Sequence, residues 1–192
     1  MGSGIAQIAA TAGHEVVVFD TNTAALDVMK QKLLKILNRL IEKERITEET
    51  RDGIISRINY TEKIADFADC GLVIEAIIEN LEIKKKVFAQ LEEITSKETI
   101  LASNTSSLSI ASIAAACRNS ARVIGIHFFN PAPLMKLVEI IPAIQTSSVT
   151  TEAAQKIIRS WGKLTVLAKD TPGFIVNRIA RPFYGEALRI LE

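Results

Sequence analysis

The sequence predicts an α/β protein in which helices cover both faces of a doubly wound, mostly parallel sheet. Short runs of β-branched and apolar residues recur along the chain, and segments with helical spacing of apolar residues separate most of them. This alternation is typical of sheets built from crossover units. No repeat, low-complexity tract or Pro/Gly-rich linker divides the 192 residues, and 48% of them are hydrophobic, which excludes a disordered chain.

The N-terminal part is expected to contain one strand and three helices. These elements are a helix at 4–12, a strand at 15–20 (EVVVFD), a helix from Asn22 or Thr23 to about Arg45, and a helix near 47–57 with Thr47 as its N-cap. A β-branched run such as EVVVFD is typical of a buried parallel strand. The long helix repeats apolar residues at three and four positions, which predicts one buried face.

Strands and helices then alternate along the rest of the chain. Strands are expected at 71–75 (GLVIE), 99–102 (TILA), 122–128 (RVIGIHF), 136–141 (KLVEII) and 164–168 (LTVLA), with helices at 82–94, 108–116 and 150–160. After Gly173 an apolar helical pattern runs to Glu192 without a stop signal. We therefore expect the natural protein to be longer.

Charge and cysteine content exclude several classes of protein. The 23 basic and 22 acidic residues give a net charge of +1, which offers no electrostatic case for binding nucleic acid or an anionic membrane. No apolar run is long enough for a membrane span, and the first residues show neither a basic region nor a cleavable signal pattern, so the expected location is the cytoplasm. Cys70 and Cys117 are expected to be reduced, and the absence of a His/Cys cluster predicts no metal site.

The N-terminus carries part of a dinucleotide-binding pattern. Asp20 follows Gly2 by eighteen residues, with a helix and a strand between them in the order that a Rossmann-type fold requires. A carboxylate at this place would bind the adenosine 2′-OH and repel a 2′-phosphate, which favours NAD over NADP. The alternative is that Asp20 only begins the turn before the next helix.

The strand and the first glycines that normally precede this pattern are missing. Met1 is therefore interpreted as an internal methionine of a longer chain. The missing strand is central in the usual strand order, so its loss would leave EVVVFD and GLVIE without their shared neighbour.

Polar residues follow three predicted strands, where ligands bind in open α/β sheets. The segments are EAIIEN (75–80), SNTSS (103–107) and HFFNPAP (127–133). Glu139 lies in the apolar strand after the last of them, and a buried carboxylate needs a partner, for which His127 is the natural candidate. A histidine oriented by a buried acid is suited to act as a general base, while Ser106 and Asn130 could bind the same substrate oxygen. The plainer alternatives are a structural histidine, a helix N-cap at SNTSS and an exposed Glu139.

Four motifs in this order and spacing resemble the L-3-hydroxyacyl-CoA dehydrogenase family. They are EAIIEN, ASNTSSLSI, GIHFFNPAPLMKLVEII and KDTPGFIVNRI, and the resemblance extends over the whole chain. It implies a Rossmann-type NAD-binding domain at 1–170, followed at 171–192 by the first helix of an all-helical domain that mediates homodimerisation. It also implies reversible NAD-dependent oxidation of an L-3-hydroxyacyl-CoA to the 3-ketoacyl-CoA in β-oxidation.

The same resemblance implies roles for individual residues. His127 would be the base and Glu139 its acidic partner, while Ser106 and Asn177 would contact the substrate carbonyl region. The residues implied for NAD are Gly2, Asp20, Glu79, Lys84, Ser106 and Asn130, and Lys43 matches a position that meets the phosphates of CoA.

Alternatives to this function stay open. The ending RPFYGEALRILE resembles the bacterial branch that handles 3-hydroxybutyryl-CoA or, in phenylacetate breakdown, 3-hydroxyadipyl-CoA. The same scaffold could instead be a dehydrogenase of a free 3-hydroxy acid or an inactive nucleotide-binding fragment. The chain could also be one part of a multifunctional fatty-acid oxidation protein.

Overall fold

The computed structural model describes residues 1–191, so that Glu192, the last residue of the predicted C-terminal segment, lies outside the described residues. The helices are α1 (Gly2–Thr11), α2 (Thr23–Glu42), α3 (Glu48–Ser56), α4 (Leu81–Ile94), α5 (Ile110–Ala114), α6 (Ser148–Ser160) and α7 (Val176–Arg189), with short 3-10 turns η1 (Ile64–Phe67) and η2 (Ser120–Arg122). The strands are β1 (Val16–Phe19), β2 (Ile58–Thr61), β3 (Leu72–Glu75), β4 (Ile100–Ser103), β5 (Val123–Phe128), β6 (Leu137–Pro142) and β7 (Leu164–Leu167).

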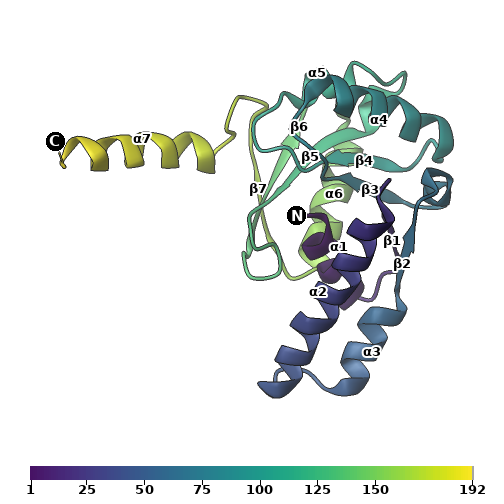
Figure 1. Cartoon of the computed structure of the whole chain (residues 1–192). Coiled ribbons are helices and arrows are strands. Elements are labelled where there is room, and N and C mark those ends of the chain that lie inside the picture. The colour runs from purple at the N-terminus through teal and green to yellow at the C-terminus, as the bar shows by residue number, and fades with distance from the viewer. Residues whose placement is uncertain (192) are drawn as a thin grey trace.

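The strands form two separate sheets (Figure 1). Parallel strands β1 and β2 make a two-stranded sheet, and the other five follow in the order β3-β4-β5-β6-β7. In the larger sheet β3, β4 and β5 are parallel to one another, and β6 and β7 are parallel to each other and run in the opposite direction, because the loop at 129–136 returns the chain antiparallel to β5. The predicted separation of EVVVFD from GLVIE is confirmed, since β1 and β3 lie in different sheets.

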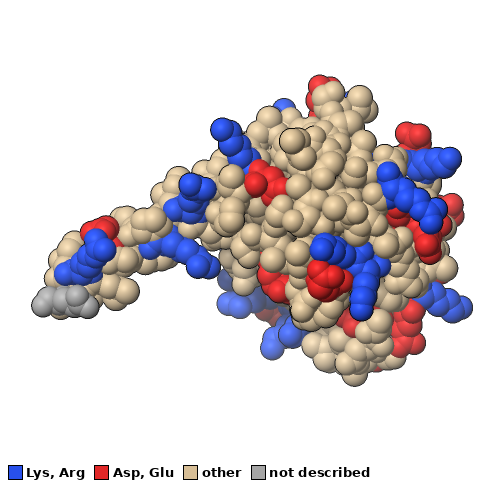
Figure 2. All heavy atoms as spheres, turned by 90° about the horizontal axis from the view of Figure 1, so that it is seen from above, with Lys and Arg blue, Asp and Glu red and all other residues tan. Residues whose placement is uncertain are grey.

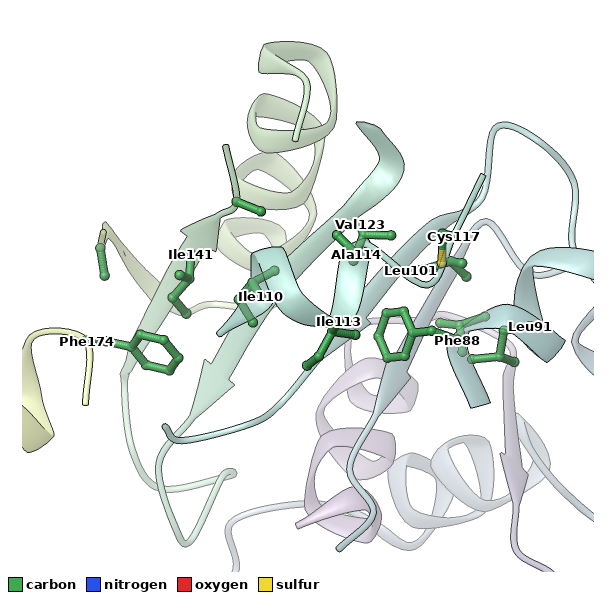
Figure 3. Close-up of a cluster of buried hydrophobic side chains, with 13 residues drawn as sticks. Phe88, Leu91, Leu101, Ile110, Ile113, Ala114, Cys117, Val123, Ile141 and Phe174 are labelled. Atoms are coloured by element: carbon green, nitrogen blue, oxygen red, sulfur yellow. The ribbon is translucent and has the colours of Figure 1, made fainter. Parts of the chain in front are cut away.

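Helices cover both faces of the five-stranded sheet, as predicted. One apolar cluster joins Phe88 of α4 and Ile113 of α5 to the sheet, and Figure 3 shows these side chains meeting those of the strands. A second cluster joins Ile5 of α1 and Ile158 of α6 to the opposite face. Successive strand residues point to opposite faces, so each central strand contributes to both clusters.

Gly125 in β5 allows α5 to pack closely on the sheet. A Cβ atom at this position would lie 2.8 Å from Cδ1 of Ile110 and 2.9 Å from Cβ of Ile141, both of which are fully buried. A larger residue would therefore push α5 away from the sheet.

Side-chain caps explain where most helices begin. Asn22, not Thr23, caps α2, since its Oδ1 accepts from the N–H groups of Ala24 and Ala25. Thr47 caps α3 as predicted, by accepting from the N–H of Thr50 at 3.2 Å. The expectation that α2 continues to about Arg45 is wrong, because the chain turns left-handed at Glu44 (φ 55°) and the helix ends at Glu42.

Two further expectations need correction. Strand β2 was not expected, because its four residues, INYT, carry no clear strand pattern and pair with β1 from a distant part of the chain. The last helix begins at Val176 and not directly after Gly173, since Gly173 (φ 78°) and Phe174 (φ 49°) both adopt left-handed backbone conformations. Figure 1 shows α7 extending away from the body of the molecule.

In Figure 2 acidic and basic side chains lie intermixed toward the edges of the visible face, around a broad uncharged area. Within residues 1–191, no helix has both the length and the apolar character that crossing a membrane requires.

Candidate active site

The three predicted polar segments meet at one edge of the five-stranded sheet. Strands β3, β4 and β5 are parallel neighbours, so the residues that follow Glu75, Ser103 and Phe128 all lie at the carboxyl ends of strands. Asn104 connects two of these segments, because its Oδ1 accepts from the N–H of Phe128 at 2.9 Å. The sequence singled out the segments, but it assigned no role to Asn104.

His127 and Glu139 form a buried pair. They face each other directly across β5 and β6, and Nδ1 of His127 lies 2.7 Å from Oε2 of Glu139. Glu139 is fully buried and His127 is 6% exposed. The rings of Phe129 and Phe174 flank the imidazole, with centroids 4.6 Å and 5.7 Å away. Glu139 is therefore not exposed at a sheet edge, and the predicted pairing with His127 is present.

The second oxygen of Glu139 binds the start of α7. Oε1 accepts hydrogen bonds of 2.9 Å from the backbone N–H groups of Ile175 and Val176. Burial by itself would raise the pKa of Glu139. The hydrogen bonds from His127, Val176 and Ile175, together with the charge of His127, instead hold that pKa below its usual value. The structure thus favours the ionised carboxylate beside the imidazole.

A second buried ion pair lies at the end of β3. Nζ of Lys84, which is 1% exposed, lies 2.7 Å from Oε1 of Glu75 and 3.4 Å from Oε2 of Glu79. Glu75 also accepts from the N–H of Ile77 and from Oγ of Ser103. The sequence suggested Glu79 and Lys84, but Glu75 received no role, because an acid at the end of a strand gives no sign of which lysine it will meet.

Glu79 organises the loop that follows β4. It accepts from the hydroxyl of Thr105, from the backbone N–H of Ser106 at 2.9 Å, and from the hydroxyls of Ser106 and Ser107 at 3.3 Å each. Burial would raise the pKa of Glu79, but the hydrogen bonds from Thr105, Ser106 and Lys84 hold it below the usual value. An anionic Glu79 therefore fixes the backbone of the loop that carries Ser106.

Asn177 lies beside Ser106. Its Nδ2 donates to the backbone carbonyl of Ser106 at 3.4 Å, so the first turn of α7 reaches the loop after β4. The structure thus brings together Ser106, Asn177, His127 and Glu139 through contacts around α7, although these residues come from four segments of the chain.

Lys163 supports the turn that follows Asn130. Asn130 itself is exposed, while Nζ of Lys163 is buried and donates to the carbonyls of Ala132 at 2.6 Å and Met135 at 2.8 Å. Burial lowers the pKa of Lys163. The sequence did not suggest this lysine, because a Gly-Lys turn usually faces solvent.

The N-terminus of α1 is the candidate site for the phosphates of a nucleotide. No side chain caps this helix, and no acidic residue lies in its first turn. The N–H groups of Gly4 and Ile5 donate to the carbonyl of Met1, which leaves those of Gly2 and Ser3 to meet a phosphate anion. A Cβ on Gly4 would lie 3.2 Å from Cδ of Pro133, which brings this helix end close to the turn after Asn130, and Gly2 is the first residue of the helix. The N–H groups at this helix end fit the pyrophosphate of a dinucleotide.

Asp20 and Lys43 mark the two ends of α2. Asp20 follows β1, and its Oδ1 accepts from the N–H of Asn22 at 2.9 Å, so it does form the turn that the plainer alternative described. Lys43 is exposed at the C-terminal end of α2, a helix of 20 residues and thus about 30 Å long, far from Asp20. The structure does not bring Lys43 near the other candidates.

Comparisons with known proteins point to one family. Residues 1–171 match the family model described as 3-hydroxyacyl-CoA dehydrogenase, NAD binding domain. The chain is 45% identical over 192 residues to 3-hydroxyadipyl-CoA dehydrogenase of Escherichia coli K12 and 44% identical over 191 residues to 3-hydroxybutyryl-CoA dehydrogenase of Bradyrhizobium diazoefficiens. All of the chain is covered in both alignments, but only 40% of the first relative and 65% of the second.

Solved structures give the same result. The crystal structure of (S)-3-hydroxybutyryl-CoA dehydrogenase from Ralstonia eutropha matches with a TM-score of 0.97 and 41% identity, over 100% of this chain and 68% of that chain. Because a family model matches most of the chain, the chain belongs to the family of 3-hydroxyacyl-CoA dehydrogenase NAD-binding domains, and NAD is its cofactor.

Proposed function

We propose that this chain supplies the NAD site and the catalytic base of an L-3-hydroxyacyl-CoA dehydrogenase. The reaction moves a hydride between NAD and the carbon that carries the 3-hydroxyl, giving the 3-ketoacyl-CoA in β-oxidation of fatty acids or in phenylacetate breakdown. The observation that carries the proposal is the buried pair of His127 and Glu139 at the carboxyl edge of the sheet.

His127 acts as the general base in this proposal. Its Nδ1 faces an ionised carboxylate and therefore carries a proton, which leaves Nε2 to accept the proton of the substrate hydroxyl. Glu139 keeps the ring in this orientation and stabilises the imidazolium that forms. NAD, when bound, accepts the hydride that leaves the same carbon.

Polar groups around the base orient the substrate and the cofactor. Ser106 and Asn177 contact the substrate carbonyl region, and Ser106 and Asn130 stabilise alkoxide character on the reacting oxygen. Glu79 and Lys84 line the nicotinamide side, where the Lys84 ion pairs keep the loop with Ser106 in place.

The adenosine end of NAD binds at the N-terminus of the chain. Gly2, in the first turn of α1, would hold the pyrophosphate, and Asp20 would accept hydrogen bonds from the ribose hydroxyls. Lys43, at the exposed end of α2, meets the phosphates of CoA. This assignment is supported only by the family motif, since Lys43 has no contact with the other candidates.

The proposal includes the surroundings of the site. Residues 1–170 form the NAD-binding domain, and residues 171–192 belong to a helical domain, beginning with α7, through which the protein forms a homodimer. An acyl-CoA substrate is consistent with the names of the relatives. The cytoplasmic location remains a prediction of the sequence.

NADH formation from L-3-hydroxybutyryl-CoA, followed by absorbance, tests the proposal. We expect turnover by the unmodified chain, and a loss on the order of 10²-fold or more in His127→Gln, as for removal of a general base. His14→Gln is the matched control, since His14 is the other of the two histidines in the chain and is exposed. Normal turnover by His127→Gln would contradict the role of His127.

The same assay separates the alternatives. L-3-hydroxyadipyl-CoA tests a dicarboxylic substrate, and free L-3-hydroxybutyrate tests a dehydrogenase that needs no CoA. NAD binding without turnover of any of these substrates would favour an inactive nucleotide-binding fragment.

A further inference from the structure

The carboxylate of Glu139 connects two parts of the molecule that are distant in sequence. Oε2 lies 2.7 Å from Nδ1 of His127 in β5, and Oε1 accepts from the N–H groups of Ile175 and Val176, which are 36 and 37 residues further along the chain. Because Glu139 is fully buried, no water can replace either set of contacts without opening the structure.

The turn that presents these two N–H groups is itself anchored. Phe174 is 3% exposed and belongs to the apolar cluster of the sheet, and Figure 3 shows its ring beside Ile141 and Ile110. The N–H of Phe174 donates to the carbonyl of Thr171, and Gly173 provides the left-handed conformation (φ 78°) that the turn requires.

The rest of α7 contributes little to holding this turn. None of the residues Val176–Arg189 is buried, and the helix extends away from the sheet in Figure 1. Its contacts with the body of the protein are made at its start, through the bonds to Glu139 and from Asn177 to Ser106. The docking of α7 and the orientation of His127 therefore both depend on the carboxylate of Glu139.

We propose that the first turn of α7 is a positioning element of the His127–Glu139 pair, in which the N–H groups of Ile175 and Val176 hold the carboxylate so that Oε2 faces His127. Oε2 of Glu139 then faces His127 only when this turn is packed against β6. This inference rests on the proposed function, because it concerns the residue to which that function assigns the proton transfer.

The charges around Glu139 support this role for the turn. From β5 the carboxylate meets His127, and from β7 its paired position is the apolar Val166. The remaining donors are the two N–H groups of the turn. Burying a carboxylate without hydrogen-bond donors is energetically unfavourable. Loss of the two hydrogen bonds from the turn therefore favours the protonated form of Glu139. A protonated acid is a poorer partner for an imidazole that must accept a proton.

Gly173→Ala tests the proposal, with Gly162→Ala as the matched control. Both glycines have a left-handed conformation, with φ of 78° and 74°, so both substitutions carry a similar backbone strain. A Cβ on Gly173 would lie 3.2 Å from the backbone nitrogen of Arg178, whereas a Cβ on Gly162 would meet nothing within 4 Å. Only the first substitution displaces the turn that carries the N–H groups of Ile175 and Val176.

The measurement is the pH titration of the Glu139 carboxyl carbon by NMR, in protein made with isotope-labelled glutamate and assigned with Glu139→Gln. We expect the carboxyl of Glu139 to titrate at higher pH in Gly173→Ala than in the unmodified protein, and Gly162→Ala to leave it unchanged. Equal titration in all three proteins would overturn the proposal. A purely structural role of the turn would lower the stability of Gly173→Ala without moving this titration, and would likewise overturn the proposal.

A second measurement does not depend on whether Gly173→Ala folds. In Glu139→Gln, the amide proton resonances of Ile175 and Val176 should move upfield, because a neutral amide accepts a weaker hydrogen bond than a carboxylate. The amide of Ile179 is the internal control, since it donates to the carbonyl of Ile175 and not to Glu139. Unchanged resonances of Ile175 and Val176 would also overturn the proposal.

These measurements separate the inference from the proposed function. His127→Gln removes the candidate base and leaves both N–H bonds to Glu139 in place. If His127→Gln keeps its turnover while Gly173→Ala shifts the titration, the proposed role of His127 fails and the coupling between Glu139 and α7 stands.

Discussion

His127 and Glu139 occupy directly opposed positions on antiparallel strands, with Nδ1 of the imidazole 2.7 Å from Oε2 of the carboxylate. A backbone register sets this relationship, so it does not depend on flexible side chains reaching across a cleft. It places an oriented imidazole at the carboxyl edge of the sheet, where the polar loops after β3 and β4 also end.

Glu139→Gln should reduce turnover while leaving the pairing geometry largely intact. A glutamine can still accept a hydrogen bond from the imidazole, but it cannot stabilise the imidazolium that forms when His127 takes a proton. We expect NADH formation to fall on the order of 10²-fold, with little change in the dissociation constant for NAD. Unchanged turnover would show that the negative charge of Glu139 is not needed.

The stability of the protein should depend on pH through Glu139. Its pKa is held below the usual value in the folded protein by the bonds from His127, Val176 and Ile175, which outweigh the effect of burial. A lowered pKa contributes stability above the pKa of the unfolded chain, near about 4.3, and this contribution is lost as the pH falls through the lower folded value.

Urea unfolding between about pH 6 and about pH 3 measures this effect. The stability of the unmodified protein should fall more steeply toward acid than that of Glu139→Gln, which has no carboxyl to titrate at this position. Glu79, whose pKa is also held low, remains in both proteins and cancels in the comparison. Parallel curves would contradict the expectation.

Lys84→Met should destabilise the protein strongly. The substitution leaves Glu75 buried without its ion-pair partner, which typically costs about 3–5 kcal/mol. Lys85→Met is the matched control, because the neighbouring lysine forms only an exposed pair with Glu82, worth at most about 1 kcal/mol. The free energy of unfolding, measured in urea, distinguishes the two variants. Similar losses of stability would mean that the buried ion pair stabilises the protein no more than the exposed one.

Asp20→Asn should weaken the preference for NAD over NADP. Asparagine keeps an oxygen that can accept from the N–H of Asn22, so the turn survives, but the charge that would repel a 2′-phosphate is removed. Calorimetric dissociation constants for the two nucleotides check the change in their ratio. Asp27→Asn, an exposed position on α2, is the control, and an unchanged ratio in Asp20→Asn would argue that Asp20 only forms a turn.

Much of the fold follows from local pattern. Short β-branched and apolar runs located most strands, and apolar residues spaced three and four apart located the long helix, because such patterns reflect which side of each element is buried. The pairing of His127 with Glu139 was also predictable, since a strand, a short turn and a returning strand keep the two residues within twelve positions. Strand β2 was not, because its pairing with β1 is a long-range contact.

The sequence by itself thus determined the class of fold and the family motifs, and it proposed the candidate catalytic residues. Tertiary packing alone decided which buried charges meet. Lys84 lies on a helix where a lysine usually faces solvent, yet it pairs with Glu75, and the N–H groups that hold Glu139 belong to a turn 36 residues away. Such contacts depend on how elements pack in three dimensions. A buried charge needs a hydrogen-bonding or ion-pair partner, and the packing determines which group lies close enough to serve.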